Sequence, residues 1–483
     1  MSDTSSSPST ATGTPGPAVT HAETYAEAER ALLARRPETK LDPTLERVEA
    51  FTHLLGDPQK AYPVIHLTGT NGKTSTSRMI DTLITALGLR TGRFTSPHVE
   101  SMTERISLDG VPLTEEQFTH AFNDVAPYAA LVDRDSVHPL SFFETVVGMA
   151  YSAFADAPVD AAIVEVGMGG AWDATNVADG RVAVITPVSV DHAQYLGETP
   201  ADIAVEKAGI IKPGATVVMA QQPLEVTEVL LERAAEVGAT VAREGLEFGV
   251  VHRLPAVGGQ MLHLQGLRGE YDEVFLPLYG AHQAQNAALA LAAVEAFAGD
   301  EALDADLVRE AFGQVTSPGR LEVVRRSPTI VLDAAHNPHG AAAVAEALQD
   351  SFTFSPLIGV VGVMADKDYE GVLAAFEPVF AEIVCTQNST QRSMPAEDLA
   401  EVARGIFGVD RVHVARRLDD ALDRAATLAE AGGVYGEAIG SGGVLVTGSV
   451  ITVGEARSML TSRAADREAA REESHRSRTG EGR

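Results

Sequence analysis

A glycine-rich segment that ends in Lys73, Thr74 and Ser75 is the clearest candidate for chemistry in this sequence. Gly69 and Gly72 allow a tight backbone turn that directs amide N–H groups at phosphate oxygens. Lys73 adds positive charge to this turn, and the hydroxyl of Thr74 or Ser75 can reach a Mg²⁺ ion. The segment therefore predicts a nucleotide-binding phosphate loop.

The residues around this loop have the pattern of a strand before it and a helix after it. Residues 64–68 are mainly apolar, as expected of a buried strand. Apolar residues recur at helical spacing over 79–87, and Gly88 stands where a helix would end. One position departs from the general pattern, which has glycine five positions before Gly72, where this chain has Leu67. We therefore predict a strand, a compact phosphate loop and a helix.

Three further residues could contribute to a metal or phosphate site. Glu165 ends an apolar segment and precedes the glycine-rich residues 167–170, so its carboxylate could face the phosphates and hold Mg²⁺. His192 follows Asp191 at the end of another apolar segment, and Lys207 comes later. Taken alone, such a glutamate is more often a surface residue, such a histidine a helix cap, and such a lysine solvated. Residue type and spacing leave both interpretations open.

Arg320 and Asp333 could contact a nucleotide from the second half of the chain. A guanidinium offers planar donors to phosphate, and a carboxylate at the end of a strand can accept from ribose hydroxyls. The alternatives are an exposed hinge cation for Arg320 and a helix N-cap for Asp333.

The single cysteine, Cys385, excludes an intramolecular disulfide, and its apolar neighbours indicate a buried strand thiol rather than a nucleophile.

Length, composition and charge limit the classes of protein. A chain of 483 residues is too long for one core, and 45% hydrophobic residues is typical of a globular protein. No apolar run is long enough to cross a bilayer, and the N-terminus lacks the order of a secretory signal. A net charge of −30 disfavours nucleic acid and anionic membranes as partners. We expect a cytoplasmic monomer that acts on small molecules.

Short apolar runs alternate with helical patterns, which is typical of α/β folds with parallel sheets covered on both faces. The runs are 161–166, 182–186, 216–219, 330–332, 358–363 and 444–447. A break at 317–319 predicts a hinge between a P-loop ATPase domain with a mainly parallel sheet, 21–316, and a smaller Rossmann-like α/β domain, 317–463. The composition of 1–20 predicts disorder, and that of 464–483 predicts a charged, solvated tail.

Several collinear motifs resemble folylpolyglutamate synthase and its bifunctional relative, dihydrofolate synthase, within the Mur ligase superfamily. The motifs are 68–74, 96–98, 103–105, 165–176, 191–192, 206–210, 282–289, 318–320 and 333–338. The family joins a carboxylate to an amino acid through an acyl phosphate. The resemblance thus implies an ATP-dependent ligase that adds L-glutamate to reduced folates and also to dihydropteroate. Two departures bear on substrate preference: Thr74 stands where many folate-branch loops have glycine, and Trp172 where leucine is usual.

The resemblance also implies roles for individual residues. Ser96, Glu165, His192 and Lys207 match positions that hold two Mg²⁺ ions, with Lys207 carboxylated by CO₂ so that its carbamate supplies oxygen. Lys73, His192 and Lys207 are the implied catalytic residues. The residues implied around ATP are Thr70, Asn71, Gly72, Lys73, Thr74, Ser75, Asn286, Arg320, Asp333 and His336. Those implied around the pterin substrate are Phe142, Phe143, Glu144, Trp172, Asp173 and Ala174.

Two other functions compete with this interpretation. A cell-wall Mur-type ligase would use the same loop and acyl phosphate, but that branch typically has an Asp-rich Asn-Pro segment where this chain has 333–338. A non-catalytic ATP-binding regulator would keep Lys73 without needing Glu165, His192 and Lys207 together.

In the reaction that the resemblance implies, Lys73 and Mg²⁺ neutralise the γ-phosphate while a substrate carboxylate attacks it. The glutamate amine then displaces phosphate to give an amide.

Overall fold

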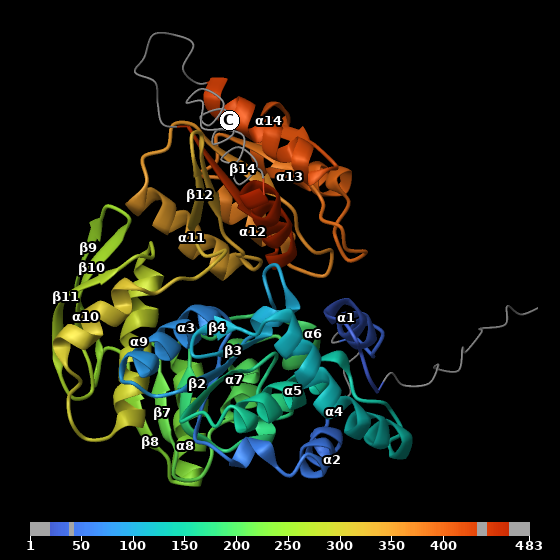
Figure 1. The fold of residues 1–483 in the computed structure, drawn as a ribbon. Helices are drawn as coiled ribbons and strands as arrows, with labels where there is room; N and C mark the ends of the chain where they lie inside the picture. The colour runs from blue at the N-terminus through green and yellow to red at the C-terminus, as the bar shows by residue number, and fades with distance from the viewer. Residues whose placement is uncertain (1–19, 38–42, 432–441, 463–483) are drawn as a thin grey trace, which may run out of the picture.

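The chain forms two lobes, one above the other, in a computed structural model that describes residues 20–37, 43–431 and 442–462 (Figure 1). The predicted disordered segment, apart from Thr20, and the predicted charged tail lie outside the described residues. The lower lobe contains an eight-stranded sheet, and the upper lobe a six-stranded sheet. No helix in the described ranges is long and apolar enough to span a membrane.

The eight-stranded sheet has the order β4-β3-β2-β5-β1-β6-β7-β8 and is parallel from β2 to β8. Its strands are β1 (Val64–Thr68), β2 (Thr91–Phe94), β3 (Ile106–Leu108), β4 (Val111–Pro112), β5 (Ala161–Glu165), β6 (Gly180–Ile185), β7 (Thr216–Met219) and β8 (Thr240–Arg243). Every residue of β1 and β5 is buried, because helices cover both faces of the sheet.

Two groups of helices cover the sheet. Apolar residues of α3 and α9 pack on one face, and those of α4, α5, α7 and α8 pack on the other. The helices of this lobe are α1 (Tyr25–Leu33), α2 (Glu46–Leu54), α3 (Lys73–Ala86), α4 (Glu115–Asp135), α5 (Phe142–Asp156), α6 (Ala193–Leu196), α7 (Pro200–Ala208), α8 (Leu224–Val237), α9 (Ala281–Ala298) and α10 (Ala305–Gly313), with 3₁₀ turns η1 (Pro58–Lys60), η2 (Met102–Arg105) and η3 (Ala174–Val177).

A three-stranded antiparallel sheet lies beside α9 and α10 (Figure 1) and was not expected from the sequence. Its strands, in the order β11-β10-β9, are β9 (Gly249–Ala256), β10 (Gly259–Gln265) and β11 (Glu270–Leu276). Continuous apolar runs mark strands that are buried on both faces, and these strands have none. Here buried residues such as Leu262 and Leu264 alternate with polar ones, because only one face meets the core.

The upper lobe has the strand order β12-β13-β17-β14-β15-β16, parallel except for the edge strand β12. Its elements are β12 (Glu322–Arg326), β13 (Thr329–Leu332), α11 (Pro338–Ser351), β14 (Leu357–Val361), α12 (Tyr369–Phe376), β15 (Glu382–Cys385), α13 (Ala396–Phe407), η4 (Val409–Arg411), β16 (Val412–Val414), α14 (Leu418–Ala431) and β17 (Gly443–Thr447), followed by a helix from 450 to at least 462. Cys385 is buried in β15 as predicted.

Both lobes have the α/β architecture that the sequence predicts. Each of the six predicted apolar runs is a strand, shifted by at most a few residues. The predicted hinge at 317–319 lies between the eight-stranded and six-stranded sheets. The division into domains at this point stays a prediction.

Candidate active site

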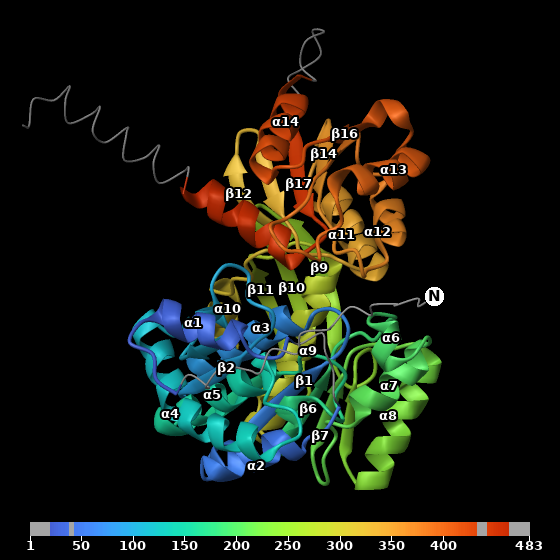
Figure 2. The same cartoon turned by 90° about the vertical axis from the view of Figure 1, so that its right-hand side faces the viewer.

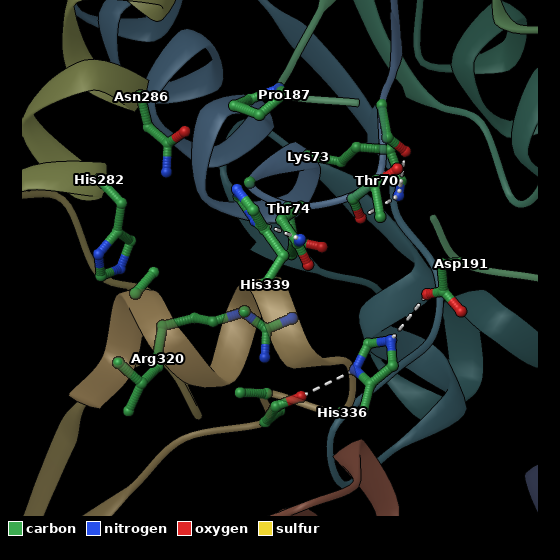
Figure 3. A pocket seen from close by; sticks show the side chains of 18 of the residues that line it. Thr70, Lys73, Thr74, Pro187, Asp191, His282, Asn286, Arg320, His336 and His339 are labelled. Carbon is green, nitrogen blue, oxygen red and sulfur yellow. Dashed lines mark hydrogen bonds and ion pairs between the residues drawn. The ribbon is translucent and has the colours of Figure 1, made fainter. Parts of the chain in front are cut away.

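A cavity of about 580 Å³ lies between the lobes, with the glycine-rich loop on one wall and residues 333–347 of the upper lobe on another. The loop leaves the carboxyl end of β1, which is the edge of a parallel sheet where ligands usually bind. Figure 3 shows Thr70, Lys73 and Thr74 facing Arg320, His336 and His339 across this space.

At two positions the loop backbone has a conformation that only glycine fits. Gly69 and Gly72 have φ of 144° and 90°. A Cβ atom on Gly69 would lie 1.9 Å from Thr186 Oγ1, and one on Gly72 would lie 2.6 Å from Asn286 Oδ1. The chain then enters α3 at Lys73, so the helix N-terminus points into the cavity mouth beside the loop. Gly88 follows α3 with φ of 80°, as the predicted helix end requires.

Two lysine ammonium groups converge on the carbonyl oxygen of Gly69. Lys73 Nζ donates to it at 2.9 Å and to Thr70 O at 3.3 Å, and Lys207 Nζ donates to it at 2.9 Å. Burial lowers the pKa of Lys73. Burial and the nearby Lys73 charge lower the pKa of Lys207 to about 7. Lys207 is therefore a buried amine that is partly neutral near pH 7, and the solvated alternative is wrong.

Glu165 is buried at the end of β5 rather than exposed at the surface. Its two carboxylate oxygens accept from the Thr74 hydroxyl at 3.0 and 3.1 Å. Burial raises the pKa of Glu165, while the charge of Lys73 opposes this shift. Thr74 and Glu165 thus place three oxygen atoms together at the floor of the cavity.

The four predicted metal-binding residues all line this cavity. They are Ser96, Glu165, His192 and Lys207. Among the described residues, no three His, Cys, Asp or Glu side chains converge as a metal site. The Glu165 carboxylate, with one hydroxyl donor, has lone pairs left for a hard cation such as Mg²⁺, which prefers oxygen. Burial lowers the pKa of His192 to about 4, so its ring is neutral at pH 7. These residues fit a cation, and their ligation of it stays a prediction.

Asp191 contacts three residues of the upper lobe. Its carboxylate lies 3.5 Å from His336 Nε2 (Figure 3). It also pairs with Lys367 Nζ at 2.5 Å, and Asn337 Nδ2 donates to it at 3.4 Å. Burial would raise the pKa of Asp191, but the His336 hydrogen bond and the charges of His192 and Lys367 hold it well below its usual range. This carboxylate therefore ties the two lobes together at the cavity.

Arg320 and Asp333 lie where the upper lobe meets the cavity. Asp333 is buried and accepts from the backbone N–H groups of Leu321, at 2.9 Å, and Ala335, at 2.8 Å. The N-cap alternative for Asp333 is wrong, because Asn337 caps α11. Arg320 is half-buried against the cavity and not an exposed hinge cation.

A second cavity of about 390 Å³ adjoins the first. Seven residues line both: Ser96, Pro97, Gly167, Met168, His192, His336 and Val450. Five of the six predicted pterin-binding residues line the second cavity. Phe142 is the exception, because its ring is buried beneath the Arg105 guanidinium, 4.9 Å away. The common wall places whatever fills one cavity next to what fills the other.

Two residues that line the second cavity also make bonds that hold the local structure. Glu144 accepts from Arg47 Nη2 at 2.8 Å and caps the start of α5. Asp173 accepts from the backbone N–H of Met168 at 2.9 Å, which holds the glycine-rich turn after β5. Trp172 lies on the cavity wall beside them.

Ser75 does not line the first cavity, although the sequence placed it with its neighbours around ATP. Its hydroxyl is buried against Ser317 Oγ, at 3.0 Å, and Gln283 Nε2, at 3.2 Å. Ser75 lies two residues after Lys73 on α3, so its side chain points to the opposite side of the helix. The other predicted nucleotide residues, among them Thr70, Asn71, Asn286 and His336, line the cavity, and their contacts with ATP stay predictions.

Lys367 is a site residue that the sequence reasoning missed. It lies a few residues after β14, in the charged run 366–368. The same rule that selected Glu165, a charged residue following an apolar parallel strand, could have found it.

Family models match the chain on both sides of the hinge. The Mur ligase middle domain matches residues 142–294, and the glutamate ligase domain of Mur ligases matches 319–450. The dihydrofolate synthase/folylpolyglutamate synthase of Mycobacterium tuberculosis is 50% identical over 90% of this chain and 93% of its own length. The Bacillus subtilis protein of the same name is 33% identical over 75% and 85%.

Solved structures agree with these sequence matches. Mycobacterium tuberculosis folylpolyglutamate synthase complexed with ADP and AMPPCP superposes with a TM-score of 0.87, at 50% identity, over 90% of this chain and 98% of that one. E. coli FolC in complex with DHPP and ADP superposes with a TM-score of 0.78, at 30% identity, over 93% and 100%. With the phosphate loop and the paired cavities in place, this chain belongs to the dihydrofolate synthase/folylpolyglutamate synthase family of Mur ligases.

Proposed function

We propose that this chain uses ATP to join L-glutamate to a reduced folate, and also to dihydropteroate, in the cytoplasm. The observation that carries the proposal is the common wall between the two cavities. It lets the γ-phosphate of ATP in one cavity lie beside a carboxylate in the other. The relatives with this name, and the homologous structures with ADP, AMPPCP or DHPP, support the same assignment.

The chain's own residues supply positioning and charge for an acyl-phosphate reaction. The amides of the loop and Lys73 bind the phosphates and stabilise charge on the γ-phosphoryl group as the substrate carboxylate attacks it. ADP leaves, and the α-amine of glutamate attacks the acyl carbon and displaces inorganic phosphate. His192, which is neutral at pH 7, lies on the common wall, where the new amide bond forms.

Mg²⁺ fits the oxygen atoms of Glu165, Thr74 and Ser96, and when bound it would offset the charge of the phosphates. We also propose that Lys207 is carboxylated. A partly neutral amine can add CO₂ and release a proton, and the resulting carbamate would replace a cation with oxygen atoms beside the metal site.

Glutamate-dependent release of ADP tests this function. Purified protein with Mg²⁺-ATP and L-glutamate should turn over with dihydropteroate and with tetrahydrofolate, offered separately. UDP-linked muramyl substrates should give no turnover. Turnover with a muramyl substrate alone would favour the cell-wall alternative, and ATP binding without any turnover would favour a regulator.

A further inference from the structure

The last helix of the described chain, 450–462, contacts two loops that reach the active site (Figure 2). One is the loop 96–105, which begins with Ser96 on the common wall of the cavities. The other is the hinge loop 317–322, which carries Arg320. Arg457 on this helix lines neither cavity, yet its side chain reaches both loops.

The Arg457 guanidinium joins two carboxylates. Its Nη1 donates to Glu100 in the loop 96–105, and its Nε lies 3.1 and 3.0 Å from the two carboxylate oxygens of Glu322. Glu322 in turn accepts from the backbone N–H of Gly319 at 2.8 Å, next to Arg320. One side chain is thus bonded to both loops, from outside the substrate cavities.

Hydrogen bonds within the loop 96–105 tie its residues together. The carboxylate of Glu104 accepts from three successive backbone N–H groups, those of Val99 at 3.0 Å, Glu100 at 2.9 Å and Ser101 at 2.8 Å. Thr95 N donates to Arg105 O at 3.0 Å and closes the loop at its base. Glu100 is therefore coupled through Glu104 to the base of the loop, where Thr95 precedes Ser96.

Close packing holds the helix against both loops. A Cβ atom on Gly454 would lie 1.9 Å from Val99 O, and one on Gly319 would lie 3.0 Å from Val453 Cγ1. The Val99 side chain packs against the apolar cluster beneath the helix. The contact therefore depends on backbone approach as well as on the ion pairs.

We propose that Arg457 is a positioning residue, which sets the placement of Ser96 relative to Arg320 and so aligns the two substrates of the ligase. The proposal rests on the proposed function, because the aligned groups are those of that reaction. Misplacement of reacting groups by about 1 Å can cost on the order of 100-fold in rate.

Arg457→Gln should lower kcat by on the order of 10- to 100-fold with a small change in melting temperature. Arg411→Gln is the matched control, because Arg411 binds Glu377 and backbone carbonyls within the upper lobe alone. Arg457→Lys should recover the melting temperature but not the rate, since an ammonium cannot span two carboxylates as a planar guanidinium does.

Hydrogen exchange supplies a readout that is independent of turnover. The amides of Val99, Glu100 and Ser101 should exchange faster in Arg457→Gln, by on the order of tenfold. Their exchange rates should be unchanged in Arg411→Gln. A wild-type kcat and wild-type exchange rates in Arg457→Gln would overturn the proposal. Changes in kcat and exchange no larger than those in Arg411→Gln would also overturn it. A wild-type protein without glutamate-dependent ADP release would instead refute the proposed function, and the exchange comparison would still decide whether Arg457 orders the loop.

Discussion

The amine of Lys207 titrates near neutrality because it is buried and lies beside Lys73. Its folded pKa of about 7 is below the ordinary value, so the neutral form increases as pH rises through 7. CO₂ adds only to that form. With ¹³C-bicarbonate we therefore expect a carbamate NMR signal that grows from pH 6 to pH 8. Lys212→Arg, at another lysine with a lowered pKa, should keep the signal, and Lys207→Arg should lose it together with turnover.

A carbamate signal that persists in Lys207→Arg would place the modification elsewhere. A Lys207→Arg protein with normal turnover would show that the reaction does not need the carbamate.

Lys73 is expected to act on the reaction rather than on the fold. Within the described part of the chain, its ammonium donates only to carbonyl oxygens of its own loop, Gly69 O and Thr70 O. Lys73→Ala should lower kcat by about three powers of ten, because the γ-phosphoryl charge loses its stabilisation, and leave the melting temperature nearly unchanged. Lys60→Ala, at an exposed lysine, is the control. A Lys73→Ala rate above a tenth of wild type would exclude the loop as the phosphate site.

Residue type marked candidates for the site where a polar residue stood at or after the end of an apolar strand. Glu165, His192 and Asp333 were candidates on this ground, the family resemblance assigned them to the site, and all three line the cavity, while their roles stay predictions. The bonds that Asp333 makes to Leu321 N and Ala335 N could not be found, because they depend on how the hinge loop folds back. Lys207 could not be recognised as buried, because lysine is usually exposed and its burial depends on how closely α7 approaches the loop at Gly69.

At the scale of elements, α3 offers a comparison between its two ends. Gly72 before it and Gly88 after it both have positive φ, but only at Gly72 would a Cβ atom meet a neighbour, 2.6 Å from Asn286 Oδ1. Gly88→Ala should cost about 1 kcal/mol for the left-handed backbone alone. Gly72→Ala should cost more and weaken ATP binding, because the loop must shift. Denaturant unfolding and ATP titration measure the two effects, and equal costs at both ends would contradict this account.

The parallel strands could be predicted from the sequence because burial on both faces makes them continuously apolar. The sheet β9-β10-β11 could not, since buried residues in β10 and β11 are interrupted by exposed or partly exposed ones and no residue of β9 is fully buried. Its place beside the nucleotide cavity also depends on long-range contact. Arg253 of β9 pairs with Asp350 of the upper lobe, 97 residues away in sequence.

At the scale of the whole molecule, Asp191 is the carboxylate through which the lower lobe holds three upper-lobe side chains. Asp191→Asn removes the charge that pairs with Lys367, so the lobes should separate more easily. We expect a larger radius of gyration by X-ray scattering for the ligand-free protein. Asp57→Asn, which changes only contacts within one local turn, should leave the scattering curve as in the wild type. An unchanged curve for Asp191→Asn would show that the lobes are held by other contacts.

The wall that the two cavities have in common also bears on inhibition. A compound that fills one cavity competes with one substrate and leaves the other free to bind. A single molecule that extends from one cavity to the other past Ser96, His192 and His336, which line both, would carry a nucleotide part and a pterin part in one scaffold. Because the second part then binds at the high local concentration set by the link, its affinity can exceed that of either part alone by about 10²- to 10⁴-fold. A stable phosphorus-containing link would also occupy the place of the acyl phosphate.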